Sequence, residues 1–327
     1  MKRRFFTLML VALPLAAVAA FAKEDYREVA FASAGDRLFA VDLRAHSILR
    51  RIPLPAGAGD VAAGMFPYDR FVLVSSPRAG RVTLVDAKRL RTVHVFMIGG
   101  HPSGIEVSPQ GKYAYVADEQ RGSVVLLNLT RRRIVGRFSV AAKPQGLAVT
   151  PDGRQLWVAS RRSVTILDTT RPSQARVLGR IRAPGAEDVA FACGGRCVWV
   201  SYRSSGWLGS VDPSSHRLTF HRVRAGMRMV SGMQAGRAGR LLWVADRAGS
   251  RVRAVDARTG RVVRSYPLAG GPLRVANGIN GRIVIASHAG ISVLTPSFWR
   301  PHHTGYHLTS IPLGLSLNGL AVVLVPH

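Results

Sequence analysis

A regular internal repeat constrains the fold of this chain more than any other feature. Short apolar segments ending in Val-Ala-Asp, Val-Ala-Ser or close variants recur along the chain with a period of roughly 42 positions. Their equivalent apolar positions are Val74, Val116, Val158, Val200, Val244 and Ile285. A second landmark, the end of the following apolar run, recurs with the same period at Asp42, Asp86, Asn128, Asp168, Asp212, Asp256 and Thr295. Because the two landmarks stay in register, we expect a chain of equivalent structural units.

Each unit contains four short β-like runs bounded by Gly, Pro and Asp turns. The third unit shows them best, at residues 146–150, 156–160, 163–168 and 175–181. Outside residues 1–22 no stretch has helical periodicity. One four-stranded sheet of this kind cannot bury both faces until neighbours stack on it. Seven landmarks therefore predict an all-β fold, a seven-bladed β-propeller of four-stranded antiparallel blades.

The two ends of the chain are expected to share one blade and so close the ring. Residues 310–325 resemble the first two strands of a blade, and residues 29–52 resemble the last three. Both ends thus offer a second strand, one more than the blade needs. The sequence leaves open which terminal strand is inserted.

Two units also carry the residues of a known repeat pattern. Residues 143–160 read KPQGLAVTPDGRQLWVAS, and residues 101–118 read HPSGIEVSPQGKYAYVAD. Both resemble the YVTN-type β-propeller repeat, in which P-x-G-[IV]-A-V-[ST]-P-D-G leads into a [YW]-V-A-[ND] strand. The resemblance covers almost all of residues 23–327 and implies an exported propeller similar to the YncE-like periplasmic proteins, some of which are associated with nucleic acid. Related propellers include lactonases, streptogramin lyases and heavy subunits of periplasmic amine dehydrogenases, so the fold alone does not determine the function.

Residues 1–22 have the features of a secretory signal peptide. Three cations at positions 2–4 precede the apolar run 5–19 and the small-residue site Ala20-Phe21-Ala22. The alternative, a transmembrane anchor, fits less well because the run is short and contains Pro14. We expect cleavage, with residues 23–327 forming a single domain without a membrane anchor in the periplasm or outside the cell.

The charge of the chain is extreme. The formal net charge is +28, and removal of the three cations in the signal segment leaves +25. Such a field attracts polyanions, acidic proteins and anionic surfaces. However, all but five of the 46 Lys and Arg side chains are Arg, a bias that codon usage alone could produce. The charge is therefore open to both a functional and a compositional interpretation.

The loops expected around one mouth of the central channel supply the candidate binding residues. Arginine predominates among them, and its planar guanidinium suits carboxylate and phosphate groups. The alternative is ordinary solvated charge, because the opposite face is also rich in arginine. Trp207 could stack on a base or a sugar. The candidate ligand-binding residues are Arg78, Lys143, Arg161, Arg162, Arg203, Trp207, Arg228, Arg247 and Arg274.

Candidates for chemistry are few. His101 and His288, with Glu187 or Glu119, are the acid–base groups expected at the mouth, and each could equally be a simple loop residue. His303 and His307 fall on one face of a strand and could hold a metal, but no carboxylate or cysteine is nearby. We expect no cofactor, because haem, zinc-protease, Walker and nucleophile-elbow motifs are absent.

The two cysteines, Cys193 and Cys197, flank a short turn between two apolar runs. In an oxidising compartment they should form a local disulfide. A redox or metal-binding CxxxC motif is the alternative, and it lacks further cysteines.

Together these observations favour a non-enzymatic, monomeric propeller that binds an anionic partner through its loop-rich face. Candidate partners are an acidic protein, a nucleic acid or an anionic envelope polymer. The alternatives are a small-molecule enzyme of the lactonase or lyase type and a scaffold subunit of a periplasmic redox or envelope complex.

Overall fold

The computed structural model describes residues 26–66, 69–202, 206–213, 218–221, 227, 229–236, 238–296 and 306–326. The predicted signal segment 1–22 and the candidates Arg203, Arg228 and His303 lie outside these residues, so they stay predictions. No helix in the described part of the chain is long and apolar enough to cross a membrane.

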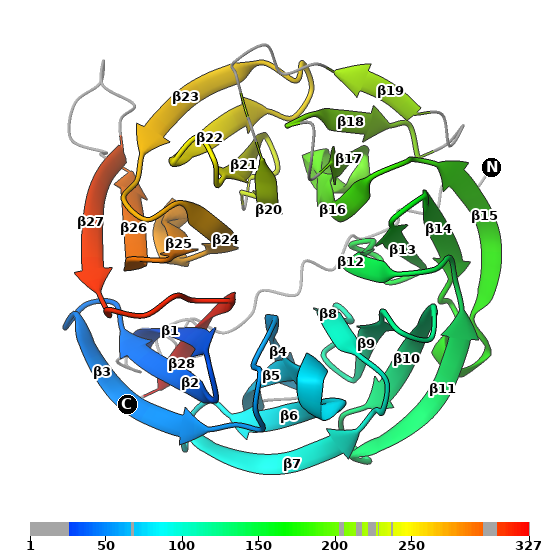
Figure 1. Cartoon of the computed structure of the whole chain (residues 1–327), viewed down its shortest axis with the longest axis horizontal. Helices are drawn as coiled ribbons and strands as arrows, with labels where there is room; N and C mark the ends of the chain where they lie inside the picture. The colour runs from blue at the N-terminus through cyan, green and yellow to red at the C-terminus, as the bar shows by residue number, and fades with distance from the viewer. Residues whose placement is uncertain are drawn as a thin grey trace, which may run out of the picture.

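The described residues form seven four-stranded antiparallel sheets arranged around a central channel (Figure 1). This arrangement confirms the predicted all-β, seven-bladed β-propeller. From the inner to the outer strand, blade 1 consists of β4 (Val61–Phe66), β5 (Asp69–Ser76), β6 (Arg81–Asp86) and β7 (Arg91–Met97). Blade 2 consists of β8 (Pro102–Val107), β9 (Tyr113–Asp118), β10 (Ser123–Asn128) and β11 (Arg133–Ser139). Blade 3 consists of β12 (Pro144–Val149), β13 (Gln155–Ser160), β14 (Ser163–Asp168) and β15 (Arg176–Arg182).

Blades 4 to 6 continue in chain order. Blade 4 consists of β16 (Ala186–Ala192), β17 (Cys197–Tyr202), β18 (Leu208–Val211) and β19 (Leu218–His221). Blade 5 consists of β20 (Val230–Ala235), β21 (Leu241–Asp246), β22 (Arg251–Asp256) and β23 (Val262–Pro267). Blade 6 consists of β24 (Pro272–Asn277), β25 (Ile283–Ser287), β26 (Gly290–Pro296) and β27 (Tyr306–Pro312).

Blade 7 joins the two ends of the chain. Its strand order is β28 (Gly319–Pro326), β1 (Tyr26–Ala34), β2 (Arg37–Asp42) and β3 (Ser47–Pro53), with Ala321 opposite Phe31. The C-terminal strand is the inner strand, and the N-terminal segment supplies the other three. The expectation of a surplus second strand was therefore wrong, because residues 310–312 belong to the outer strand of blade 6. Inner and second strands are both short and apolar, so composition did not distinguish them.

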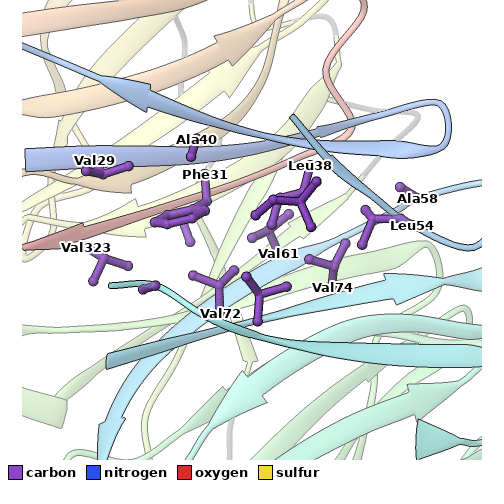
Figure 2. Close-up of a cluster of buried hydrophobic side chains, with 14 of the residues drawn as sticks. Val29, Phe31, Leu38, Ala40, Leu54, Ala58, Val61, Val72, Val74 and Val323 are labelled. Atoms are coloured by element: carbon purple, nitrogen blue, oxygen red, sulfur yellow. The ribbon is translucent and has the colours of Figure 1, made fainter. Parts of the chain in front are cut away.

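The core lies between neighbouring blades. Where blade 7 meets blade 1, Phe31 and Leu38 pack against Val61, Val72 and Val74, all nearly inaccessible to water (Figure 2). Burying such side chains contributes about 25 cal/mol per Å² of apolar surface, and each blade gains it only when a neighbour covers its face. The ring is therefore stabilised as a whole.

The strand-end aspartates of the repeat are structural. Asp42, Asp86 and Asp256 each accept hydrogen bonds from two backbone N–H groups of the turn that follows. The bond from the Thr259 N–H is the largest influence on Asp256 and lowers the pKa of its carboxyl. These carboxylates stabilise the turns at the end of the molecule opposite the candidate loops, as aspartate commonly does in turns.

Candidate functional site

The seven inner strands line the central channel, which has a volume of about 790 Å³. An inner strand is the edge of its sheet, so half of its backbone N–H and C=O groups face the channel without a strand partner. Three carboxylates from inner-strand positions accept such N–H groups of the next blade. The bonds run from Ile105 N to Asp60 Oδ2 (3.1 Å), Val149 N to Glu106 Oε1 (3.5 Å) and Met233 N to Asp188 Oδ2 (3.3 Å).

One arginine offsets part of this negative charge. Arg274, on β24, places its Nε 3.4 Å from Asp60 Oδ1, so it reaches from blade 6 past the closing blade to blade 1. Its Nη1 also donates to the backbone oxygens of Ser231 (2.6 Å) and Leu273 (3.2 Å). Asp60, Glu106 and Asp188 therefore lie in the channel together with the guanidinium group of Arg274.

Burial changes the protonation of the channel carboxyls. It raises the pKa of Glu106 to about 8; the hydrogen bond from Val149 opposes the shift, and the charges of Asp60 and Asp188 reinforce it. Burial also raises the pKa of Asp188 to about 6, although the positive charge of Arg274 acts in the opposite direction. At neutral pH Glu106 thus holds a proton, while Asp188 is largely ionised.

A second hollow, with a volume of about 870 Å³, lies on the loop-rich face between blade 2 and the loop that leads to blade 3. We call it the rim hollow. Its walls include His101, Glu119 and Lys143, three residues that the sequence placed on this face, together with Arg121 and Ser139. His101 Nδ1 lies 3.4 Å from Glu119 Oε2. The other candidates for chemistry lie elsewhere: Glu187 lines the channel, and His288 Nδ1 contacts Ser316 Oγ near blade 7.

The rim hollow rests on the buried carboxylate of Asp118, at the end of β9. This carboxylate accepts bonds from His101 N (3.1 Å), Arg121 N (3.2 Å), Arg121 Nη1 (3.1 Å) and Arg137 Nη1 (2.8 Å). Burial acts to raise the pKa of Asp118, but these hydrogen bonds outweigh it and the pKa is lowered. Asp118 therefore stays ionised and holds the loops in place.

Further predicted cations are exposed on loops that join second and third strands, at the same end of the molecule. Arg78 follows β5, Arg161 and Arg162 follow β13, and Arg247 follows β21. None of these four forms an ion pair with a residue that the structure describes. At the opposite end, in contrast, Asp86 pairs with Arg89 (2.8 Å) and Asp168 with Arg176 (3.3 Å).

The remaining candidates lie away from both hollows or partly inside the core. Trp207 is half-buried and packs against the apolar cluster between blades 3 and 4. Cys193 and Cys197 are joined by a disulfide across the turn before β17. His307 is exposed on the outer strand β27. Within the described ranges, no three His, Cys, Asp or Glu side chains are grouped closely enough to hold a metal ion.

Sequence reasoning missed Glu106, the channel residue with the largest pKa change. It also assigned Arg274 to the loops of the mouth, whereas Arg274 lines the channel itself, together with Asp60 and Asp188. A signal was present, because Glu106 occupies the position at which the third unit has Ala148. A charged residue at an otherwise small, apolar repeat position is a sign of a site.

Comparisons with known proteins support the fold. The structure is similar to a functionally unknown protein from Desulfotomaculum acetoxidans (TM-score 0.74, 12% identity, 91% of this chain and 99% of that chain covered). It is also similar to hydrazine synthase from Kuenenia stuttgartiensis (TM-score 0.69, 17% identity, 79% and 89% covered) and to virginiamycin B lyase from Staphylococcus aureus (TM-score 0.63, 11% identity, 78% and 84% covered). No family model and no curated protein matches the sequence. At these identities the likeness shows the propeller fold, which serves both enzymes and subunits of complexes.

Proposed function

We propose that the protein is an exported, non-enzymatic propeller of the YVTN-repeat type that binds a polyanionic partner through its loop-rich face. One observation carries the proposal: Arg78, Arg161, Arg162 and Arg247 are exposed on that face, and none of them pairs with an acid among the described residues. Unpaired guanidinium groups offer bidentate hydrogen bonds to carboxylate or phosphate. The signal-like features of residues 1–22 support export, so the proposed partner is one of the periplasm or of the outside of the cell.

The test is binding of poly-L-glutamate and of single-stranded DNA across a series of salt concentrations. The variant carries Arg78→Ala, Arg161→Ala, Arg162→Ala and Arg247→Ala. The matched control neutralises four exposed arginines of the opposite face, through Arg131→Ala, Arg154→Ala, Arg171→Ala and Arg258→Ala. Both proteins lose four charges, so the general field of the molecule falls equally.

We expect the loop-face variant to bind a polyanion about tenfold more weakly, from four contacts each contributing a few tenths of a kcal/mol. Its salt dependence should also become shallower, since fewer counterions are released on binding. Equal losses in the two variants would mean that only net charge matters, and the proposal would be rejected.

A second candidate function, small-molecule chemistry of the lactonase or lyase type, is favoured by the contact between His101 and Glu119. A carboxylate near Nδ1 orients an imidazole so that Nε2 can act as a base. The test is turnover of a panel of lactones. Activity that His101→Gln abolishes and His288→Gln leaves unchanged would support this candidate, and activity insensitive to His101 would reject it.

A further inference from the structure

We propose that the rim hollow is a carboxylate subsite, in which Lys143 binds an acidic side chain of a protein segment that lies across the loop face. The proposal rests on the proposed function and narrows it from polyanions in general to an acidic polypeptide. The lysine is assisted by His101 and Arg121 on the walls of the same hollow.

The backbone of Lys143 is the first observation. Lys143 lies four residues before Leu147, the inner-strand residue that pairs with the landmark Val158. At the equivalent positions of blades 1, 4 and 6 the chain has Gly57, Gly185 and Gly271, with φ of +78°, +84° and +59°. Lys143 adopts the same left-handed conformation, with φ of +57°, which a residue with a Cβ atom tolerates poorly. Glycine would be the less strained residue here, so the lysine side chain has a role that outweighs its backbone strain.

Left-handed backbone alone would not carry this inference. Leu90 and Arg132 are also left-handed, but they lie in hairpin turns at the opposite end of the molecule. Lys143 differs from them because its exposed ammonium group borders a hollow and forms no ion pair with a described residue. Lys143 thus combines a strained backbone, a place on the wall of a hollow and a charge without an ion-pair partner among the described residues, which Leu90 and Arg132 do not.

The charge of the hollow indicates which anion it takes. Asp118 is already bound by Arg121 and Arg137, and Glu119 lies beside His101 Nδ1. Lys143, Arg121 and Arg137 supply three positive charges around the hollow, and Asp118 and Glu119 supply two negative ones, so these five side chains carry a net charge of +1. A singly charged carboxylate neutralises it, whereas a phosphate dianion would leave an uncompensated charge in a half-enclosed site.

Two exposed arginines of blade 3, Arg161 and Arg162, follow the strand that pairs beside Lys143. Pro144 pairs with Ser160 in the sheet, so Lys143 and Arg161 leave blade 3 side by side. An extended acidic segment can therefore place one carboxylate in the rim hollow and the next ones over Arg161 and Arg162. Charged groups arranged in this order fix the register of a bound segment.

The experiment measures binding of hexaglutamate and of a thymidine hexanucleotide to the full chain, with acetate as a small probe. The variant Lys143→Gly removes the charge and relieves the backbone, so it should fold with an unchanged or higher Tm. We expect it to bind hexaglutamate roughly threefold to tenfold more weakly, while Lys143→Arg retains binding. Acetate should shift the amide resonances of Gly122, Ser139 and residue 143 in the wild type and not in Lys143→Gly.

The arms of this experiment separate the subsite from the proposed function. If Lys143→Gly binds hexaglutamate and acetate like the wild type while the four-arginine variant loses binding, the proposed function stands and the subsite is rejected. If the oligonucleotide binds more tightly than hexaglutamate through Lys143, the acidic polypeptide is the wrong partner. If no variant changes any binding, both proposals are rejected.

Discussion

The central channel and the loop-rich face around its mouth carry opposite charges, although the same repeat builds both. In the channel, Asp60, Glu106 and Asp188 each accept a backbone N–H of a neighbouring blade, and Arg274 pairs with Asp60. On the face, Arg78, Arg161, Arg162 and Arg247 are exposed and have no acidic partner among the described residues. Carboxylates inside the ring thus satisfy strand edges, whereas cations outside it remain available to bind a partner. Changes in the channel should alter stability, and changes on the face should alter binding.

The largest effect is expected where the two regions meet, at Asp118. Asp118→Ala removes a buried acceptor of four hydrogen bonds and leaves Arg121 and Arg137 without it. We expect a loss of about 3–5 kcal/mol in the free energy of unfolding, measured by urea denaturation. Asp168→Ala, in an exposed turn, is the control and should lower the free energy of unfolding much less. A similar loss in both would show that Asp118 is only another turn residue.

An intermediate effect is expected for Arg274→Met in the channel. The substitution keeps much of the apolar stem but removes the cation that faces Asp60 and favours the ionised form of Asp188. Because Arg274 is partly exposed, we expect a loss of about 1–2 kcal/mol at pH 8. The loss should shrink below pH 5 as Asp188 becomes protonated in either protein. A loss that does not vary with pH would indicate packing instead of charge.

A strongly pH-dependent effect is expected for Glu106→Gln. The folded-state pKa of Glu106, about 8, lies above its ordinary value of 4.5, so the folded protein holds this proton more tightly than the unfolded chain. Its contribution to stability is therefore full below pH 4.5 and decreases as the pH rises towards 8. Glutamine cannot ionise, so the variant should match the wild-type Tm near pH 5 and exceed it at pH 9. A Tm difference that stays constant from pH 5 to pH 9 would contradict this assignment.

The smallest effect on stability is expected on the loop face. Arg161→Ala and Arg162→Ala together should change the free energy of unfolding by about 0.5 kcal/mol or less, because both side chains are solvated and unpaired. The same pair should weaken polyanion binding measurably in the salt titration. A marked drop in Tm would show that these arginines support the fold and would weaken the case for a binding face.

The repeat made the number of blades and the loop end of each blade predictable, because both follow from landmarks that lie within a single repeat unit. The role of the turn aspartates was predictable for the same reason, since Asp86 and Asp256 bond to N–H groups two and three residues away. The grouping of carboxylates in the channel was harder to predict from the sequence. Asp60, Glu106 and Asp188 belong to blades 1, 2 and 4, whereas blade 3 has Gly146 and Ala148 at the equivalent positions.

The sequence by itself determined a ring of seven equivalent β-sheets, because its apolar periodicity can be buried only when such sheets stack on one another. It also determined a large excess of cations over the whole chain. Only the tertiary structure decided that the C-terminal strand is the inner strand of the closing blade. It also decided that three carboxylates from different blades line the channel together with Arg274, and that His101, Glu119 and Lys143 share one hollow. The physical reason is closure: contacts between blades depend on how the whole ring packs, and no single repeat contains that information.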